Sequence, residues 1–404
     1  MKILLVNDYG TPTAGAERIT RDLRDSLRAR GHTVRVFSSR AQLIAGESIA
    51  DTTCFGTTSR MQTLSSTMNP PAARALRHEL ETFNPDVVQV HMFLWQLSPA
   101  ILPLLKNRPC IYYAVTFKPV CPTGLKWLPS GEQCHVTAGV ACLRNNCITI
   151  SGFAPLMLQH YLWRAQRRNF SAVVACSNAV RQYLEADDIA VRDVIWPGTP
   201  ETSARPALDG APVVTYAGRL VREKGVDILV RAFQQVHVKL PDAQLHIAGS
   251  GPEHAALAAL VTELRLSDCV TFHGQLNDSE LQALLARSWT HVVPSRWPEP
   301  FGMTATEAMM RGTAVVASNL GGLADSVVSG VTGFHVPPGD ASALGESLVT
   351  LLSCPARAEA MGINARARAL DMFSLDRCTA RFEALYAELT SPTQREHISE
   401  FALP

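Results

Sequence analysis

The chain has 404 residues, of which 47% are hydrophobic and 18% are charged, and its formal net charge is +1. This length exceeds a single ordinary core and predicts two domains of a globular protein. No run of eighteen apolar residues occurs, and Met-Lys leads directly into an apolar strand, so we expect neither a spanning helix nor a signal peptide. We therefore expect a cytoplasmic location. We expect no nucleic-acid partner.

The first half alternates apolar strands with helices, which predicts a parallel sheet. Strands are expected at 3–7, 34–38, 87–91, 110–115, 172–176 and 191–196, and helices at 16–30, 74–83 and after Ser177. Gly31 follows the first helix, where glycine commonly ends a helix. Gly15 precedes that helix, where a bare backbone can approach a phosphate or a sugar, although a simple loop glycine is an equally good interpretation.

Residues 117–150 form a cysteine-rich insert in the first domain. Cys121, Cys134, Cys142 and Cys147 lie within 27 residues of one another, among glycine and proline. In a cytosolic protein, such a group indicates a structural zinc more than a disulfide pair, with free, partly buried thiols as the alternative. The six remaining cysteines are scattered and are expected in the core.

A segment that is both apolar and basic follows at 153–170, with Arg164, Arg167 and Arg168 near its end. It predicts either a helix that packs on the core and carries a solvated basic end, or an amphipathic helix on an anionic membrane. The charge distribution leaves similar alternatives open, because residues 1–205 carry +7 and residues 206–404 carry −6. A basic first half could face an anionic acceptor or the headgroups of the inner membrane face, or it could simply be solvated.

The second half repeats the alternation of strands and helices from Val213 to about residue 352. Residues 197–212 are rich in Pro, Gly, Ser and Thr and are the best candidate for a linker. We therefore expect a first domain at 1–200, a second at 212–372, a closing helix at 373–390 and a disordered tail at 391–404. The predicted fold class is α/β with two Rossmann-like parallel sheets.

The most informative stretch is Pro298-Glu299-Pro300-Phe301-Gly302-Met303-Thr304-Ala305-Thr306-Glu307. The prolines place Glu299 in a loop, Gly302 allows a tight turn, and a partly buried helix is expected from Met303 to Gly312. The unpaired amides at the helix start favour an anion such as phosphate, and ionised carboxylates accept hydrogen bonds from sugar hydroxyls. A nucleotide sugar carries hydroxyls on both sides of a diphosphate and matches this pattern, whereas two ordinary surface glutamates are the alternative.

Several motifs around this stretch resemble the signatures of family-4 glycosyltransferases, which are retaining enzymes of the two-domain GT-B fold. These are Pro294-Ser295-Arg296, Glu299-Pro300-Phe301-Gly302, Glu307-Ala308-Met309, Gly312 to Ala317, Gly218-Arg219-Leu220, Glu223-Lys224-Gly225, Ala248 to Glu253, Phe272-His273-Gly274, Gly321 to Asp325 and Gly333 to Asp340. The resemblance is dense from about residue 212 to 345 and looser before that. It implies that the last helix crosses back to the first domain.

The resemblance also implies roles for single residues. Arg219 and Lys224 would hold the diphosphate and neutralise its growing charge as the sugar departs, although surface ion pairing is their ordinary alternative. Glu299 would bind sugar hydroxyls and Glu307 the ribose, while the amides of Phe301, Gly302 and Met303 line the donor site. Gly15 would lie beside the donor, and His91, at the end of a strand, would hydrogen-bond the transferred sugar. A buried core histidine is the alternative for His91.

The implied reaction transfers a hexose with retention of configuration from a UDP- or GDP-sugar to a hydroxyl acceptor. It requires no metal cofactor, because the cationic pair neutralises the leaving group. Related sequences often have His-Asp where this chain has Val115-Thr116, so the acceptor contact differs. A non-catalytic protein that binds nucleotide sugars is therefore a second hypothesis. A dinucleotide-dependent oxidoreductase is disfavoured, because the first loop lacks G-x-G-x-x-G and the second strand ends in Ser38-Ser39.

Overall fold

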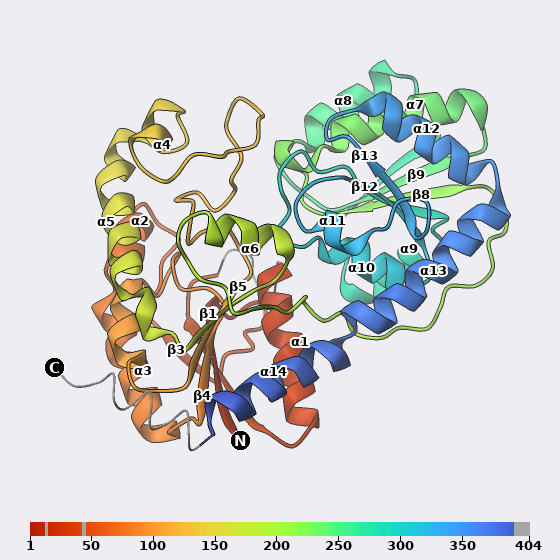
Figure 1. The fold of residues 1–404 in the computed structure, drawn as a ribbon. Coiled ribbons are helices and arrows are strands. Elements are labelled where there is room, and N and C mark those ends of the chain that lie inside the picture. Colours follow the sequence, from red (N-terminus) through yellow and green to blue (C-terminus); the bar gives the residue numbers. More distant parts are fainter. Residues whose placement is uncertain (13–14, 43–45, 392–404) are drawn as a thin grey trace. The chain divides into compact units, whose positions relative to one another are not determined.

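The computed structural model describes residues 1–12, 15–42 and 46–391. The chain divides into two compact units (Figure 1). Unit 1 comprises residues 1–129, 134–198 and 375–404, and unit 2 comprises 130–133 and 199–374. Each unit holds its own parallel sheet with helices against it, which confirms the predicted class of two Rossmann-like domains.

The sheet of unit 1 has seven strands in the order β3-β2-β1-β4-β5-β6-β7, all parallel. Their bounds are β1 Lys2–Tyr9, β2 Thr33–Ser39, β3 Thr52–Cys54, β4 Val87–Val90, β5 Cys110–Ala114, β6 Ala172–Ala175 and β7 Asp193–Val194. Helices cover a parallel sheet on both faces, so its strands are continuously apolar. The run Ile3-Leu4-Leu5-Val6 of β1 shows this, because all four side chains have 0% exposure.

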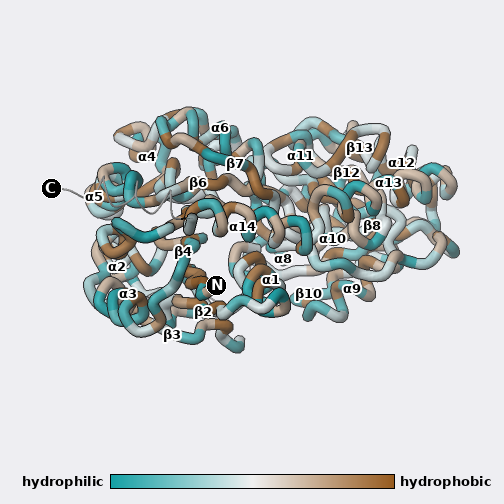
Figure 2. Tube along the Cα trace, turned by 60° about the horizontal axis from the view of Figure 1, so that its bottom comes forward, coloured by the Kyte–Doolittle hydropathy of each residue, from teal (hydrophilic) through white to brown (hydrophobic). Residues whose placement is uncertain are grey.

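The helices of unit 1 are amphipathic where they pack on this sheet. Helices α1 and α3 alternate hydrophilic and hydrophobic residues along their length (Figure 2). The Asn69 side chain caps α3 by accepting from the amide of Ala72 at 3.1 Å. The helices are α1 Gly15–Ala29, α2 Gln62–Thr67, α3 Pro70–Phe83, the 3-10 helix η1 Pro99–Leu105, α4 Val140–Arg144, α5 Ile150–Gln166, η2 Arg167–Asn169 and α6 Asn178–Glu185.

The sheet of unit 2 has six parallel strands in the order β10-β9-β8-β11-β12-β13. Their bounds are β8 Val213–Ala217, β9 Gln244–Ala248, β10 Val270–Gly274, β11 Thr290–Val293, β12 Ala314–Ser318 and β13 Gly333–Val336. The helices are η3 Arg222–Lys224, α7 Val226–Lys239, α8 His254–Glu263, α9 Asp278–Ala286, α10 Met303–Met310, α11 Leu323–Ser326, α12 Ala341–Leu352 and α13 Pro355–Phe373. One buried apolar cluster joins the sheet to its helices.

The last helix, α14 (Leu375–Leu389), belongs to unit 1, so the chain returns to the first unit as the resemblance implied. Thr379 Oγ1 donates to Ser26 Oγ of α1 at 2.8 Å, and Glu383 accepts from His32 at 2.8 Å. The part of the predicted tail beyond residue 391 lies outside the described residues. Within the described part of the chain, no helix is long and apolar enough to cross a membrane.

Residues 199–212 differ from a free linker, because they pack on unit 2. Arg205 is 8% exposed, and it donates to the carbonyl of Gly312 at 3.0 Å and to Glu359 at 3.0 Å. The composition of this segment suggested an unstructured connection, but one arginine gives it fixed partners. The chain passes between the units at 129/130, 133/134, 198/199 and 374/375.

Strand order determines where a ligand can bind in each unit. In unit 2 the chain runs from β8 outward to β9 and β10, and then returns to place β11 on the other side of β8. In unit 1 the corresponding neighbours are β1 and β4. Open α/β sheets bind ligands beyond the carboxyl ends of the strands at such reversals, where the two loops diverge and leave a crevice. The relevant segments are therefore those after β8, β11, β1 and β4.

Candidate donor-binding site

The loops after β8 and β11 are joined by their backbones in unit 2. The amide of Arg296 donates to the carbonyl of Glu223 at 2.9 Å. Gly225 has φ +66, and a Cβ there would lie 2.2 Å from the carbonyl oxygen of Pro294. Only glycine permits this close approach in a left-handed conformation. The loop that carries Arg219 and Lys224 is thus fixed against the loop that carries Glu299.

Lys224 and Glu299, both predicted site residues, form a close ion pair. Lys224 Nζ donates to Glu299 Oε1 at 2.6 Å, with side-chain exposures of 18% and 7%. The hydroxyl of Ser295, itself fully buried, donates to the same carboxylate oxygen. A buried carboxylate with a cation and a hydroxyl donor is stabilised in its ionised form. The sequence spacing did not predict that the two residues would bind each other.

Trp297 completes the surroundings of this pair. Lys224 Nζ lies 5.4 Å from the centre of the indole ring, within the range of a cation–π contact. Burial by itself would raise the pKa of Glu299, but Lys224, Ser295 and Trp297 outweigh burial and hold the pKa below its ordinary value. Ser295 and Trp297 are therefore positioning residues that the sequence analysis missed. Ser295 was visible only as part of a motif with no stated role.

Helix α10 begins at Met303, as predicted, directly after the Glu299 loop. Gly302 is its N-cap with φ +95 and has no side chain to cap the first amides, so the predicted anion cradle is geometrically reasonable. Phe301 is 3% exposed and is therefore buried. Glu307 lies one turn into the helix with 4% exposure, so a ribose would meet an almost completely buried carboxylate.

The Arg219 side chain is much more exposed to solvent than that of Lys224. Its side chain is 61% exposed, and the ion pair with Glu223 has an N···O distance of 3.7 Å. An exposed and long ion pair contributes little, so moving this guanidinium to a phosphate costs little. Arg219 is thus an available cation beside the preformed Lys224 and Glu299 pair.

Glycines hold the neighbouring loops of this edge together by backbone contact. Gly249 has φ +135, and a Cβ there would lie 1.8 Å from the carbonyl oxygen of Gly218. Gly321 has φ +64, and its Cβ would lie 2.4 Å from the carbonyl oxygen of Glu299. The amide of Gly322 donates to that same carbonyl at 2.7 Å. The backbone of Glu299 is therefore fixed as firmly as its side chain.

Substituting Gly249 by alanine should destabilise unit 2, because the added methyl would overlap the Gly218 carbonyl. We expect a loss of about 3 kcal/mol or more in the free energy of unfolding, measured by urea denaturation. Gly330→Ala is the matched control, since Gly330 has φ +79 but nothing within 4 Å of its Cβ position. Equal urea midpoints for the two variants would show that the positive φ, and not the close contact with the Gly218 carbonyl, explains the need for glycine at position 249.

In unit 1 the structure places His91 in the core, and its predicted sugar contact stays a prediction. The residue follows β4 as expected, but its side chain has 0% exposure. Its Nε2 pairs with Gln89 Nε2 at 2.8 Å and its Nδ1 with Thr20 Oγ1 at 2.7 Å, and burial lowers the pKa of His91 to about 3. Both ring nitrogens have partners, so the imidazole is a neutral, buried side chain in this structure.

The partners of His91 determine its tautomer. Tyr386 of α14 donates to Gln89 Oε1, so the Gln89 amide nitrogen donates to His91 Nε2. His91 Nδ1–H then donates to Thr20 Oγ1, and Thr20 donates to the carbonyl of Ala16 at 3.0 Å. This chain of hydrogen bonds connects the returning helix to the first turn of α1, where Gly15 lies. Thr13 and Ala14 are outside the described residues, so the donor contact at Gly15 stays a prediction.

Two charged residues of unit 1 that the sequence analysis missed lie at the ends of β1 and β5. Asp8 is fully buried and accepts from the amides of residues 95, 96 and 97 at 2.7 to 2.9 Å, which fixes the segment after β4. Burial raises the pKa of Asp8 to about 6 and lowers that of Lys118 to about 8. Lys118 follows the departure at Val115-Thr116, where Thr116 is only partly buried. Lys118 does not occupy the position of the histidine that related sequences often have, but its amine follows Val115-Thr116 closely in the chain.

Sequence comparison identifies the family that this geometry suggests. The family described as Glycosyltransferase Family 4 matches residues 13–199, and the family described as Glycosyl transferases group 1 matches residues 199–368.

The chain belongs to glycosyltransferase family 4.

Curated relatives of this family 4 protein include glycogen synthase of Mycobacterium tuberculosis, which is 34% identical over 213 residues, or 52% of this chain and 50% of the relative. A lipopolysaccharide core mannosyltransferase, LpcC, of Rhizobium leguminosarum is 32% identical over 55% of this chain and 66% of the relative. The family 4 chain thus spans about half the length of the first relatives it matches.

Solved structures show the same GT-B fold over nearly the whole chain. Sucrose-phosphate synthase from Thermosynechococcus elongatus superposes with a TM-score of 0.73 at 24% identity, covering 96% of this chain and 99% of that one. HepE from Anabaena, solved in complex with UDP, superposes with a TM-score of 0.69 at 21% identity, covering 96% and 100%. At such identities the likeness establishes the fold of this family 4 protein alone.

The zinc site predicted at Cys121, Cys134, Cys142 and Cys147 of the family 4 protein stays a prediction. Among the residues that the structure describes, no three or more His, Cys, Asp or Glu side chains are arranged to hold a metal ion. Cys121 Sγ pairs with Thr123 Oγ1 at 3.2 Å, and Cys147 Sγ donates to the carbonyl of Asn145 at 3.8 Å. Cys134 and Cys142 are buried. Free, partly buried thiols are the alternative weighed from the sequence.

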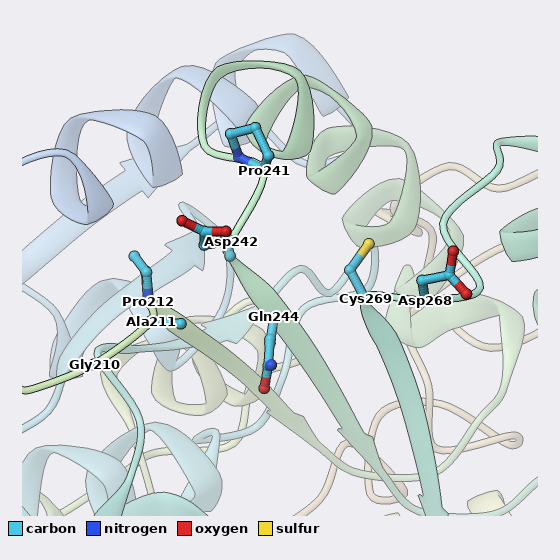
Figure 3. Close-up of a pocket in the computed structure, with 9 residues that line it drawn as sticks. Gly210, Ala211, Pro212, Pro241, Asp242, Gln244, Asp268 and Cys269 are labelled. Carbon is cyan, nitrogen blue, oxygen red and sulfur yellow. The ribbon is translucent and has the colours of Figure 1, made fainter.

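A pocket of about 440 Å³ in unit 2 lies away from the donor-binding edge. Figure 3 shows that residues from the starts of β8, β9 and β10 line it, among them Pro212, Gln244 and Cys269. Parallel strands bind ligands at their carboxyl ends, and this pocket is at the amino ends. It is therefore not part of the family 4 site.

Proposed function

We propose that this chain is a retaining glycosyltransferase that moves a hexose from a nucleotide sugar to a hydroxyl acceptor. The ion pair of Lys224 and Glu299 beside the start of α10 carries the proposal, because it puts a cation and a sugar-binding carboxylate at the reversal between β8 and β11. The names of the relatives support transfer of sugars, and HepE was solved with UDP and with UDP-glucose. A UDP- or GDP-sugar is the donor class that fits these observations.

In the proposed reaction, Arg219 and Lys224 neutralise the diphosphate as the bond to the sugar breaks. The first amides of α10 bind the diphosphate, Glu299 accepts from sugar hydroxyls, and Glu307 accepts from the ribose. Glu299 already bonds Lys224 and Ser295, so it is poorly suited to act as a covalent nucleophile. The acceptor hydroxyl would therefore attack on the face of the leaving group, and the diphosphate would help to remove its proton. The cationic pair supplies the charge that a divalent metal provides elsewhere.

Donor binding can be tested with a thermal-shift panel of nucleotides and nucleotide sugars. A ligand that binds the folded state raises Tm, so we expect one base, uridine or guanosine, to stabilise the protein more than the other diphosphates. The adenosine diphosphate series is the matched control for non-specific phosphate binding. No shift with any diphosphate or nucleotide sugar would contradict the donor assignment.

Turnover separates the enzyme from the binding protein that the sequence left open. Incubation with the stabilising donor should release the sugar slowly by hydrolysis, and NMR of the first product should show the anomeric configuration of the donor. Inversion would contradict a retaining mechanism. Donor binding with neither hydrolysis nor transfer to any glycan, glycolipid or small-molecule acceptor would instead identify a non-catalytic nucleotide-sugar-binding protein.

A further inference from the structure

Helix α5 exposes a continuous apolar stripe on the outside of unit 1. Ile150, Ala154, Leu158, Tyr161 and Ala165 recur every three or four residues and are all exposed. The exposed fractions of Ile150, Leu158 and Tyr161 are 83%, 47% and 68%. This spacing puts them on one side of the helix, over a length of about 22 Å at 1.5 Å per residue. Such a stripe normally faces a core, but here it faces solvent.

The opposite side of α5 already attaches the helix to unit 1. Gln159 donates to the carbonyls of Ser66 and Leu94 at 2.6 and 2.9 Å, and the Trp163 indole donates to the carbonyl of Pro119 at 3.1 Å. Trp163 has 0% exposure. The fold therefore does not need the exposed stripe, since a separate set of side chains provides packing. The basic end of the helix is partly used as well, because Arg164 pairs with Asp187 at 2.8 Å.

Helix α2 lies beside α5 (Figure 1). Apolar side chains in α2 and at its two ends are exposed. Thr67 Oγ1 donates to the carbonyl of Pro155 at 3.0 Å, which links the two helices. Met61, Leu64 and Met68 are 65%, 60% and 53% exposed. We call the exposed apolar residues of both helices the α2/α5 surface: Met61, Leu64, Met68, Ile150, Ala154, Leu158, Tyr161 and Ala165. Exposed apolar groups of this extent usually mark an interaction site.

Exposed arginines flank the α2/α5 surface along the chain, while Arg164 of α5 is paired with Asp187. Arg60, Arg144 and Arg168 are exposed, next to Met61, before the start of α5 and just beyond its end. Apolar side chains flanked by arginines are the composition of helices that lie in the headgroup region of anionic membranes.

We propose that the α2/α5 surface of unit 1 binds an anionic lipid bilayer. The apolar side chains enter the boundary between headgroups and acyl chains, and the flanking arginines contact lipid phosphates. A second copy of the chain is a poorer occupant, because a twofold contact would bring this surface against itself and oppose only like charges. Of the two interpretations of residues 153–170, a core-packed helix with a solvated basic end or a helix on an anionic membrane, this assigns the membrane to the exposed side of α5. It does not depend on the proposed transferase activity.

Co-sedimentation of the full chain with vesicles tests the proposal. Vesicles of phosphatidylcholine mixed with phosphatidylglycerol should bind the protein, and added salt should weaken this binding. The double variant Leu158→Glu/Tyr161→Glu should bind at least about tenfold more weakly, because two apolar side chains no longer enter the bilayer. Arg168→Glu should weaken binding about fivefold or more by losing a contact with anionic lipid.

Ile363→Glu is the matched control, because Ile363 is 66% exposed on α13 of unit 2. It should bind vesicles like the unsubstituted protein, and every variant should keep its Tm and nucleotide-induced thermal shift. Equal vesicle binding by the Leu158→Glu/Tyr161→Glu variant and the Ile363→Glu variant would overturn the proposal. The proposal would also be overturned if the unsubstituted protein did not bind vesicles and the same double substitution abolished a dimer or a protein complex in size-exclusion chromatography.

Discussion

Replacing Lys224 by alanine should reduce sugar release from the donor by about 100- to 1,000-fold, the usual effect of removing one preorganised donor from a developing negative charge. The ammonium is held 2.6 Å from Glu299 before any ligand arrives, so its position costs nothing at the moment of reaction. Arg219 remains in this variant, but it is 61% exposed and cannot replace a fixed cation. Steady-state donor hydrolysis, followed by release of the nucleoside diphosphate, measures the effect.

The same substitution also leaves Glu299 buried without its cation. We therefore expect a lower Tm for Lys224→Ala, because an unpaired buried carboxylate destabilises the folded state. Lys224→Arg restores the charge with a different shape and should recover Tm more fully than turnover. Activity of Lys224→Ala within a few-fold of the unsubstituted enzyme, at equal folded fraction, would contradict the assigned role.

Replacing Glu299 by glutamine should change binding and turnover in opposite directions. Lys224 loses its anionic partner and becomes available to the diphosphate, and the negative charge near the incoming phosphates disappears. We expect the Kd of the preferred nucleoside diphosphate to fall about fivefold, which corresponds to about 1 kcal/mol. Turnover of the nucleotide sugar should fall at least about tenfold, because the carboxylate that accepts from the sugar hydroxyls is lost. Titration calorimetry and donor hydrolysis measure the two effects.

Glu223→Gln is the control for this substitution, since it removes one negative charge from the same edge. Among the ion pairs of the described residues, the Glu223 side chain takes part in one, with the exposed Arg219 at 3.7 Å. We therefore expect Glu223→Gln to change the Kd of the nucleoside diphosphate less than Glu299→Gln does. Weaker binding of the nucleoside diphosphate by Glu299→Gln would mean that Lys224 is oriented for phosphate by Glu299 and is not held back by it.

Much of the fold was predictable because it depends on local patterns. Continuous apolar runs such as Ile3 to Val6 predicted buried parallel strands, and the glycine after residue 30 predicted the end of α1 within one or two residues. The returning helix followed from the family resemblance. The segment 199–212 was less predictable, because its attachment depends on Arg205 reaching Gly312 and Glu359, which are more than a hundred residues away.

The candidate site also combines features that were predictable from the sequence with features that were not. The motifs and the family resemblance predicted Arg219, Lys224, Glu299 and Glu307 as site residues, and the structure brings Lys224 and Glu299 together. Ser295 and Trp297 were missed because their importance comes from the direction of their side chains toward Glu299. His91 was given a sugar contact, yet its two ring nitrogens meet Gln89 and Thr20 across the core.

The amino-acid sequence by itself determined two α/β units, the family and the loop that carries the paired glutamates, because strand periodicity, glycine positions and motif spacing are local properties. Tertiary structure decided which charges are paired, that His91 is buried and which side of α5 faces solvent. Those properties depend on where distant strands and helices bring their side chains, and spacing along the chain does not encode direction in space.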